Sequence, residues 1–324
     1  MKAAVLTKNG IEINSVAEPQ VQSNQVLVRV HVCGLNRADL HVAAGQMHGS
    51  SGGIGTIPGL EWSGEIVEVG AEVPNFKAGD RVMCSGASGY AEYAVTDWGR
   101  VSSIPSSQMS FEQAATLPVA LKTMHDAIVT NGQFQKGHSV MIQGASTGVG
   151  LMGMQIAKYM GASLVIGTST NAERRARLKD FGADLALDSS DPGWPDEVLN
   201  ATGGKGVHLI VDQVSASVAN QNMKAAAVCG HIVNVGRLGG FKGEFDYDLH
   251  ALKRLRYIGV TFRTRSLEEV REINRKMQAD LWDAVKSETL QLPIDRIFPL
   301  DEAVDALAYM KANAHFGKIL MSTS

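Results

Sequence analysis

A glycine-rich segment between an apolar strand pattern and an apolar helix pattern has the residue types and spacing to hold a pyrophosphate. Residues 139–143 read SVMIQ, residues 144–150 read GASTGVG, and an apolar helical stretch follows at 151–160. A strand, a tight turn and a helix in this order aim free backbone N–H groups and the positive end of the helix at one anion. We therefore expect a dinucleotide to be bound by Ser146, Thr147, Gly148, Val149 and Gly150.

The same turn departs from the G-x-G-x-x-G pattern of dinucleotide sites. Ala145 and Thr147 stand where the first two glycines would be, and only the third, Gly150, is kept. A glycine-rich turn can also serve close packing alone, so the segment is a weak signal by itself. Its place between a strand and a helix is what makes the prediction useful.

The next strand pattern, residues 163–168, leads into hydroxyl and cationic side chains. Thr168, Ser169 and Thr170 are followed by Arg174. No acidic residue stands where an NAD-preferring site binds the ribose hydroxyls, whereas a 2′-phosphate is bound by hydroxyl groups and a cation. We therefore predict NADPH as the cofactor, with these four residues around its 2′-phosphate. Asp188 argues against this, because a nearby carboxylate would repel the phosphate.

Composition excludes several classes of protein. A chain of 324 residues predicts two domains, and 44% hydrophobic residues are enough for large cores. A net charge of −3 leaves no basic surplus for nucleic acid, and no apolar run approaches the ~20 residues that span a bilayer. Cys33, Cys84 and Cys229 are too far apart for a C-x-x-C metal pair or a disulfide framework, so we expect a cytoplasmic protein.

The pattern of elements changes along the chain. The first hundred residues carry short β-rich runs separated by turn residues, which predicts mostly antiparallel strands. From residue 139, strand and helix patterns alternate at intervals that suit crossover connections and a parallel sheet. In that part we expect strands at residues 139–143, 163–168, 209–212 and 231–235, then a last strand at 256–262, a helix at 266–287 and a strand at 318–322.

Several short motifs in register resemble the medium-chain dehydrogenase/reductase superfamily, and specifically its quinone oxidoreductase branch. Besides the turn, they are CGLNRADL at 33–40, PGLEWSGEIVEVG at 58–70, GDRV at 79–82, GYAEY at 89–93 and FGKI at 316–319. The resemblance spans nearly the whole chain. It implies an α/β protein with a GroES-like, β-rich catalytic domain and a Rossmann domain with a doubly wound parallel sheet.

The resemblance also implies the domain boundaries and the assembly. The GroES-like domain would comprise residues 1–120 and 265–324, and the Rossmann domain residues 121–264. The last Rossmann strand, residues 257–262 here, would pair with its copy in a homodimer.

The zinc ligands of the superfamily's metal-dependent members are incomplete in this sequence. Cys33 stands at the first ligand position, but Leu60 occupies the second, where an aliphatic side chain cannot coordinate zinc. Residues 118–124 contain no cysteine or carboxylate for the third position, and the four-cysteine lobe of the structural zinc is missing. We therefore expect no metal, although His31 shares a strand face with Cys33 and leaves a rebuilt site geometrically open.

Without a Lewis acid, reduction of an electron-poor acceptor is favoured over alcohol oxidation. The resemblance predicts zinc-independent, NADPH-dependent hydride transfer to a quinone, a small-molecule electrophile. The alternative reaction is reduction of the C=C bond of an α,β-unsaturated carbonyl or acrylate-type compound. An alternative of another class is a protein that binds NADPH without turnover.

The resemblance assigns the remaining site residues. Asn36 would lie beside the nicotinamide ribose and the substrate, and Thr123 under the nicotinamide ring, as the catalytic residues; an ordinary turn residue and an ordinary helix residue are the alternatives. Met47 replaces a tyrosine that many quinone reductases carry, so the proton donor is left open. We expect the substrate pocket to be lined by Met47, Trp62 and Phe262. Further expected cofactor contacts are Val214, Gly236, Phe262, Arg263 and Lys318.

Overall fold

The computed structural model describes residues 1–49 and 51–323. Contacts between Cα atoms divide the chain into two compact units. Unit 1 consists of Met1–Val119 and Phe262–Ser324, and unit 2 is Ala120–Thr261. Along the sequence, unit 2 is therefore inserted between the two stretches of unit 1.

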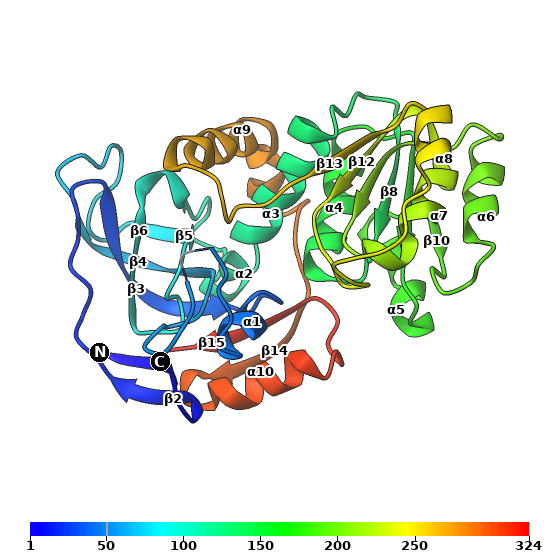
Figure 1. Ribbon diagram of the computed structural model, residues 1–324. Coiled ribbons are helices and arrows are strands. Elements are labelled where there is room, and N and C mark those ends of the chain that lie inside the picture. Colours follow the sequence, from blue (N-terminus) through cyan, green and yellow to red (C-terminus); the bar gives the residue numbers. More distant parts are fainter. Residues whose placement is uncertain (50, 324) are drawn as a thin grey trace. The chain divides into compact units, whose positions relative to one another are not determined.

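Unit 1 is built mainly on antiparallel strand pairs that join distant parts of the chain, while β14 and β15 pair in parallel. The strand order of its large sheet is β14-β15-β3-β4-β5-β7, with β6 also paired to β3, while β1 and β2 form a separate pair. Near the end of the chain β15 pairs with β3, which comes early (Figure 1). The strands are β1 (Lys2–Thr7), β2 (Gly10–Ser15), β3 (Gln25–Gly34), β4 (Glu61–Val69), β5 (Arg81–Ser85), β6 (Tyr93–Asp97), β7 (Val101–Ser103), β14 (Ile294–Pro299) and β15 (Lys318–Ser322).

The long helix of unit 1 confirms the helix expected at 266–287. Helix α9 (Leu267–Lys286) begins after Ser266, whose side chain caps Glu269 N–H while Glu269 caps Ser266 in return. Arg271 on this helix binds both carboxylate oxygens of Asp97, at 3.0 and 2.7 Å, and fixes α9 to the end of β6. The shorter helices of unit 1 are α1 (Asp39–Ala43), α2 (Phe111–Ala115) and α10 (Ala303–Lys311).

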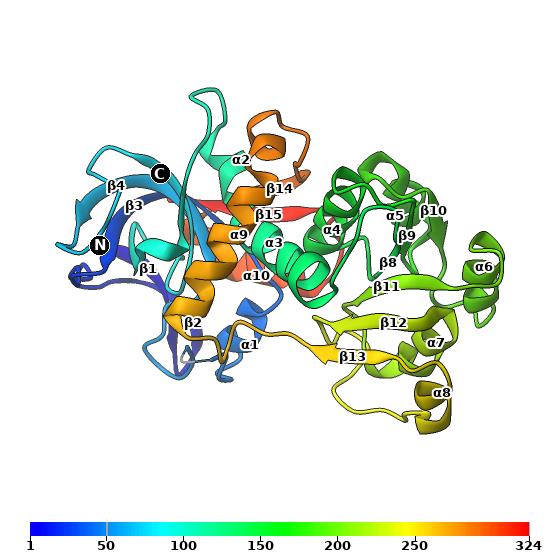
Figure 2. The same ribbon diagram turned by 90° about the horizontal axis from the view of Figure 1, so that it is seen from above.

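Unit 2 contains a six-stranded parallel sheet in the order β10-β9-β8-β11-β12-β13 (Figure 2). The order runs outward in both directions from β8 and β11, as in a doubly wound sheet, so the expected fold class is confirmed. The strands are β8 (Ser139–Gln143), β9 (Leu164–Thr168), β10 (Leu185–Leu187), β11 (Val207–Asp212), β12 (Ala226–Asn234) and β13 (Arg256–Gly259). The helices are α4 (Gly148–Tyr159), α5 (Ala172–Ala176), α6 (Trp194–Ala201), α7 (Ala219–Ala225) and α8 (Tyr247–Leu252), with α3 (Pro118–His125) beginning in unit 1.

Several element boundaries differ from the expected ones: β12 begins at Ala226 rather than at residue 231, β11 begins at Val207 rather than at 209, and α4 and β13 also differ. Helix α4 begins at Gly148, three residues before the apolar stretch, because the Thr147 side chain accepts a hydrogen bond from Gly150 N–H and caps the helix there. Strand β13 ends at Gly259 rather than at residue 262, since Val260 N–H bonds Asn234 O and the chain then leaves the sheet. Of the helices in the described part of the chain, none is both long and apolar enough to cross a membrane.

Candidate active site

The turn between β8 and α4 is open on one side and tightly packed on the other. Ser146, Thr147, Gly148 and Val149 are half-exposed, whereas Gly150 is buried. A Cβ atom on Gly150 would lie 2.7 Å from both Cα and O of Ala145, so the helix can approach the turn this closely only with glycine here. The N–H groups of Gly148 and Val149 have no acceptor one turn earlier in the helix and can face an anion. The N–H group of Gly150 donates to Thr147 Oγ1 instead, so Gly150 serves the packing of the turn.

A chain of hydrogen bonds between buried polar side chains connects this turn to the neighbouring strand and helix. Gln143 at the end of β8 accepts from Thr168 Oγ1 at 2.6 Å and donates to Asn222 at 2.9 Å. Asn222 donates in turn to Asp212 at 3.0 Å. Asp212 also accepts the N–H groups of the two residues that follow Gln213 in the loop after β11. Burial raises the pKa of Asp212, and these hydrogen bonds oppose that rise.

Thr168 belongs to this chain of hydrogen bonds and does not bind the 2′-phosphate. Its side chain is fully buried, and its hydroxyl both donates to Gln143 and accepts from Gly144 N–H at 3.0 Å. The prediction for Thr168 is therefore wrong. The hydroxyl of Thr147 is likewise used inside the protein, where it donates to Gln213 at 2.8 Å and accepts from Gly150 N–H. The backbone of Thr147 is used as well, since its N–H donates to Gly144 O at 3.3 Å and its O accepts from Leu151 N–H.

Val214 and Gly236 lie beside the glycine-rich turn, on the loops after β11 and β12. A Cβ atom on Gly144 would lie 3.5 Å from Val214 Cγ2, and one on Gly236 would lie 2.6 Å from Gln213 O. Gln213 connects the two loops to the turn, since its Nε2 donates to Gly144 O at 3.3 Å. The structure thus brings Val214 and Gly236 together with residues 144–150 within unit 2.

The end of β9 carries the hydroxyl and cationic cluster that the sequence indicated. Ser169 Oγ donates to Ser146 Oγ at 3.1 Å, which ties the cluster to the turn, and Thr170 is exposed. Arg174 is half-buried at the start of α5. Arg175 contacts Ser169 O at 2.8 Å and Asp188 at 2.9 Å, so the carboxylate that was expected to repel a phosphate is paired with a cation.

In unit 1, Asn36 is part of a second buried polar network. Its Nδ2 donates to Glu61 Oε1 at 2.9 Å, and its Oδ1 accepts from Lys318 Nζ at 3.2 Å. Lys318 also forms a short ion pair with Glu61 and donates to Leu35 O at 2.9 Å. The three N–H groups of Lys318 therefore each have a protein acceptor, and Lys318 is a structural partner of Asn36 instead of the predicted cofactor contact.

Asp39 and Tyr90 extend this network. Asp39 Oδ2 accepts from Asn36 N–H at 2.8 Å and from Tyr90 Oη at 2.7 Å, while its Oδ1 is buried without a hydrogen bond. Burial raises the pKa of Asp39 to about 6, although the hydrogen bonds from Tyr90 and Asn36 and the charge of Lys318 lower it. The folded protein therefore holds an acid that ionises about two pH units higher than an ordinary aspartate.

This carboxyl predicts a pH dependence of stability. Because the pKa of Asp39 is higher in the folded chain than in the unfolded one, its contribution to stability is fully present below about pH 4 and is lost as pH rises to about 6. The Asp39→Asn variant lacks this loss, which amounts to about 3 kcal/mol at ~1.4 kcal/mol per pKa unit. Urea unfolding at pH 4.0 and 6.5 measures most of this loss, and equal pH slopes for wild type and variant would contradict it.

The remaining predicted site residues differ in how far they are buried and in the element that carries them. Trp62 is fully buried in the core of unit 1, so the prediction that it lines a substrate pocket is wrong. Met47 is 62% exposed on the loop after α1, and Phe262 is half-buried. Arg263 is exposed, its backbone lies next to Gly49, and its charge adds to the burial that lowers the pKa of His48. Thr123 is half-buried on α3 in unit 2.

The residues at the superfamily's zinc position do not present a ligand set. Cys33 is fully buried, its thiol lies 3.6 Å from Met321 O, and burial raises its pKa, which disfavours the thiolate that zinc binds. Leu60 is half-buried. Among residues 1–49 and 51–323, no three histidine, cysteine, aspartate or glutamate side chains gather as metal ligands would.

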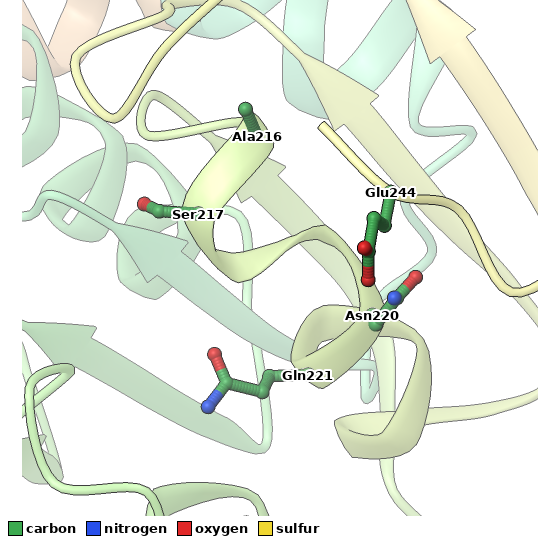
Figure 3. A pocket seen from close by; sticks show the side chains of 5 residues that line it. All are labelled: Ala216, Ser217, Asn220, Gln221 and Glu244. Carbon is green, nitrogen blue, oxygen red and sulfur yellow. The ribbon is translucent and has the colours of Figure 1, made fainter. Parts of the chain in front are cut away.

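A surface cavity of about 330 Å³ lies in unit 2, and none of the predicted pocket residues lines it. It is lined by Ala216, Ser217, Asn220, Gln221 and Glu244, which come from the turn before α7, from α7 itself and from the loop before α8 (Figure 3). Asn220 accepts from Asp246 N–H at 2.9 Å, so this side chain helps to anchor that loop. The cavity is polar and shares no residue with the turn at 144–150.

Several residues of the site escaped the sequence analysis. Gln143 and Asp212 each close a parallel strand, and a polar residue at that place is a signal that could have been used. Glu61 is a charged residue that opens a strand of buried neighbours, which is another such signal. Tyr90 gave no signal of its own, because its partner Asp39 is 51 positions away.

The comparisons with known proteins agree with this architecture. Residues 22–106 match the model of the alcohol dehydrogenase GroES-like domain, and residues 148–279 match that of the zinc-binding dehydrogenase family. The chain is 28% identical to quinone oxidoreductase-like protein 2 of Bos taurus over 97% of this chain and 90% of the relative, and 28% identical to the quinone oxidoreductase of Rattus norvegicus over 90% and 87%.

A solved structure is similar over its whole length. The alcohol dehydrogenase superfamily protein from Novosphingobium aromaticivorans superposes with a TM-score of 0.89 at 28% identity and covers 100% of both chains. The first model lies within unit 1, the second covers most of unit 2 and continues to residue 279 in unit 1, and the named relatives extend along nearly the entire sequence. The chain therefore belongs to the medium-chain dehydrogenase/reductase superfamily.

Proposed function

We propose that this protein is an NADPH-dependent oxidoreductase that transfers a hydride to a quinone without zinc. The observation that carries the proposal is the turn at residues 144–150, which is half-exposed at the start of α4 and supported by buried side chains whose hydrogen bonds are satisfied within the protein. The likeness to two quinone oxidoreductase relatives over 90% or more of this chain supports the choice of acceptor.

The bound dinucleotide would supply two electrons and one hydrogen as hydride, and a proton from water would complete the hydroquinone. The protein contributes binding, orientation and a hydrogen-bond donor for the oxygen that gains negative charge. Ser146, Gly148 and Val149 would hold the pyrophosphate, and Asn36 would be the donor. An electron-poor acceptor needs no metal to stabilise an alkoxide, which suits the buried thiol of Cys33 and the aliphatic Leu60.

The test of this function is a panel of acceptors with NADPH consumption as the readout. We expect oxidation of NADPH with a small quinone, and slower or no oxidation with an α,β-unsaturated ketone. Faster turnover of the ketone would favour the C=C reductase. Tight NADPH binding with no turnover of any acceptor would favour a non-catalytic binding protein, and one tightly bound zinc per chain would contradict zinc independence.

The preference for NADPH rests on the cluster at the end of β9. Arg174→Ala removes a cation from the proposed 2′-phosphate site, and charge-assisted hydrogen bonds contribute about 1.5–3 kcal/mol. We therefore expect kcat/KM for NADPH to fall about 10- to 100-fold, with kcat/KM for NADH unchanged. The exposed Arg177→Ala is the matched control. Wild-type protein that uses both cofactors equally would contradict the preference.

We also propose a homodimer through β13. This strand is the last in the order of the parallel sheet, and Tyr257 and Ile258 are only half-buried there. A Cβ atom on Gly259 would meet nothing within 4 Å, so a second strand could approach the backbone closely. Light scattering is expected to give the mass of two chains; the mass of one chain at micromolar concentration would refute the dimer.

A further inference from the structure

The ion pair of Glu61 and Lys318 is removed from solvent and joined to one amide. The exposed fraction of the side chain is 0% for Glu61 and 7% for Lys318, so neither charge is solvated. The Asn36 side chain binds both partners, with its NH₂ group on Glu61 and its oxygen on Lys318. An ion pair buried in this way has a large desolvation cost and commonly adds little stability.

We propose that this ion pair is a positioning device that fixes which edge of the Asn36 amide faces which way. A carboxylate can only accept hydrogen bonds, and an ammonium group can only donate them. The NH₂ group must therefore face Glu61, and the amide oxygen must face Lys318. A rotation of the amide by half a turn would place oxygen against oxygen and NH₂ against the ammonium group.

The fixed orientation leaves one N–H of Asn36 for another partner. The second bond of Nδ2 goes to Gly34 O at 3.4 Å, which is long for a hydrogen bond. A substrate oxygen that gains negative charge would accept this N–H more strongly than Gly34 O does. This step rests on the proposed function, in which Asn36 Nδ2 is the hydrogen-bond donor to the substrate oxygen. The inference adds that the ion pair of Glu61 and Lys318 orients this donor.

Glu61 and Lys318 themselves have no free polar atoms toward a substrate. Lys318 donates to Leu35 O, Asn36 and Glu61, and the second oxygen of Glu61 accepts from Val119 N–H at 2.8 Å. They are therefore positioning residues for Asn36. The competing explanation is that the pair only holds β15 and the start of α3 against β4.

Neutralising both charges separates these two explanations. Glu61→Gln and Lys318→Met each leave one buried charge without its partner, so both single variants are expected to lose stability and activity. The double variant Glu61→Gln/Lys318→Met has no buried charge in this pair and is expected to unfold at nearly the wild-type urea concentration. Because Val119 N–H still needs an acceptor, the oxygen of the glutamine amide introduced at position 61 is expected to face it, and the NH₂ group then faces Asn36, which no longer favours the wild-type orientation of the Asn36 amide.

In the double variant we expect kcat for the quinone to remain at least about 10-fold below wild type, with KM for NADPH unchanged. The matched control is another ion pair of unit 1, between Arg271 and the buried Asp97, replaced as Asp97→Asn/Arg271→Met with kcat retained. Recovery of wild-type kcat together with stability in the Glu61 and Lys318 double variant would overturn the proposal.

A readout that needs no substrate keeps this inference distinct from the proposed function. The side-chain NH₂ signals of Asn36 in a ¹⁵N–¹H spectrum can be assigned as those missing from Asn36→Asp. In wild type we expect two well-separated proton shifts, because one proton is bonded to a carboxylate, and in the double variant a smaller separation. Unchanged shifts would refute the positioning role even if the enzyme reduces quinones. Changed shifts in a protein that turns over no acceptor would refute only the proposed function.

Discussion

Replacing Gly150 by valine is expected to weaken cofactor binding about 100-fold. Even a Cβ atom at this position would lie 2.7 Å from the Ala145 backbone, so the side chain must push α4 away from the turn. Overpacking of this kind costs about 3 kcal/mol or more, which corresponds to a loss of affinity of about 100-fold. Titration of NADPH fluorescence measures the effect, with circular dichroism to show that the variant is folded.

A second glycine of the same helix provides the control. A Cβ atom on Gly153 would meet Met124 Sδ at 3.0 Å, and this sulfur belongs to a flexible side chain that can move. Gly153→Ala is therefore expected to bind NADPH within about threefold of wild type, a change of less than ~1 kcal/mol. If the Kd of Gly150→Val for NADPH also stayed within about threefold of wild type, the turn would not hold the cofactor.

The second large effect is expected from Gly64→Ala in unit 1. Gly64 pairs with Val30 where the register between β3 and β4 shifts, and its added Cβ atom would lie 1.9 Å from Arg29 O. The two strands cannot keep their hydrogen bonds at that separation. We expect the free energy of unfolding to fall by more than about 4 kcal/mol, a magnitude that single substitutions reach only through such severe conflicts.

Urea unfolding with fluorescence detection measures this loss. Glu68→Ala is the matched control, because Glu68 is exposed on the same strand and its replacement should change stability by no more than about 0.5 kcal/mol. If Gly64→Ala and Glu68→Ala unfold at the same urea concentration, the close approach of β3 and β4 at Gly64 is not a determinant of stability.

Local patterns in the sequence were sufficient where an element carries its own signal. The amphipathic pattern from Ser266 to Ser287 predicted α9 to within a residue at each end. The strands β8 and β9 were recognised because they are apolar runs bounded by turn residues. Strand β10, Leu185–Leu187, has only three residues and no such pattern, and it was missed.

Side-chain roles that depend on distant partners could not be predicted in this way. Thr168 was expected to face a phosphate because its neighbours in sequence are hydroxyl residues, but its partner Gln143 lies on the adjacent strand β8. Lys318 was assigned to the cofactor from its motif, yet its charge is opposed by Glu61, 257 positions earlier. The order of strands had to be known before either assignment could be corrected.

The pairing of β15 with β3 has a consequence for how the chain is assembled during synthesis. Ala120–Thr261 is one continuous segment, so its sheet can form as soon as that segment has left the ribosome. Strand β3 must wait for residues 318–322, and until then Glu61 lacks the cation that opposes its charge in the folded chain. We therefore expect translation to leave unit 1 loosely folded until β15 arrives, and the Asn36 amide to acquire its orientation in the same step. A nascent chain would in this way become catalytically competent only after residues 318–322 have been synthesised.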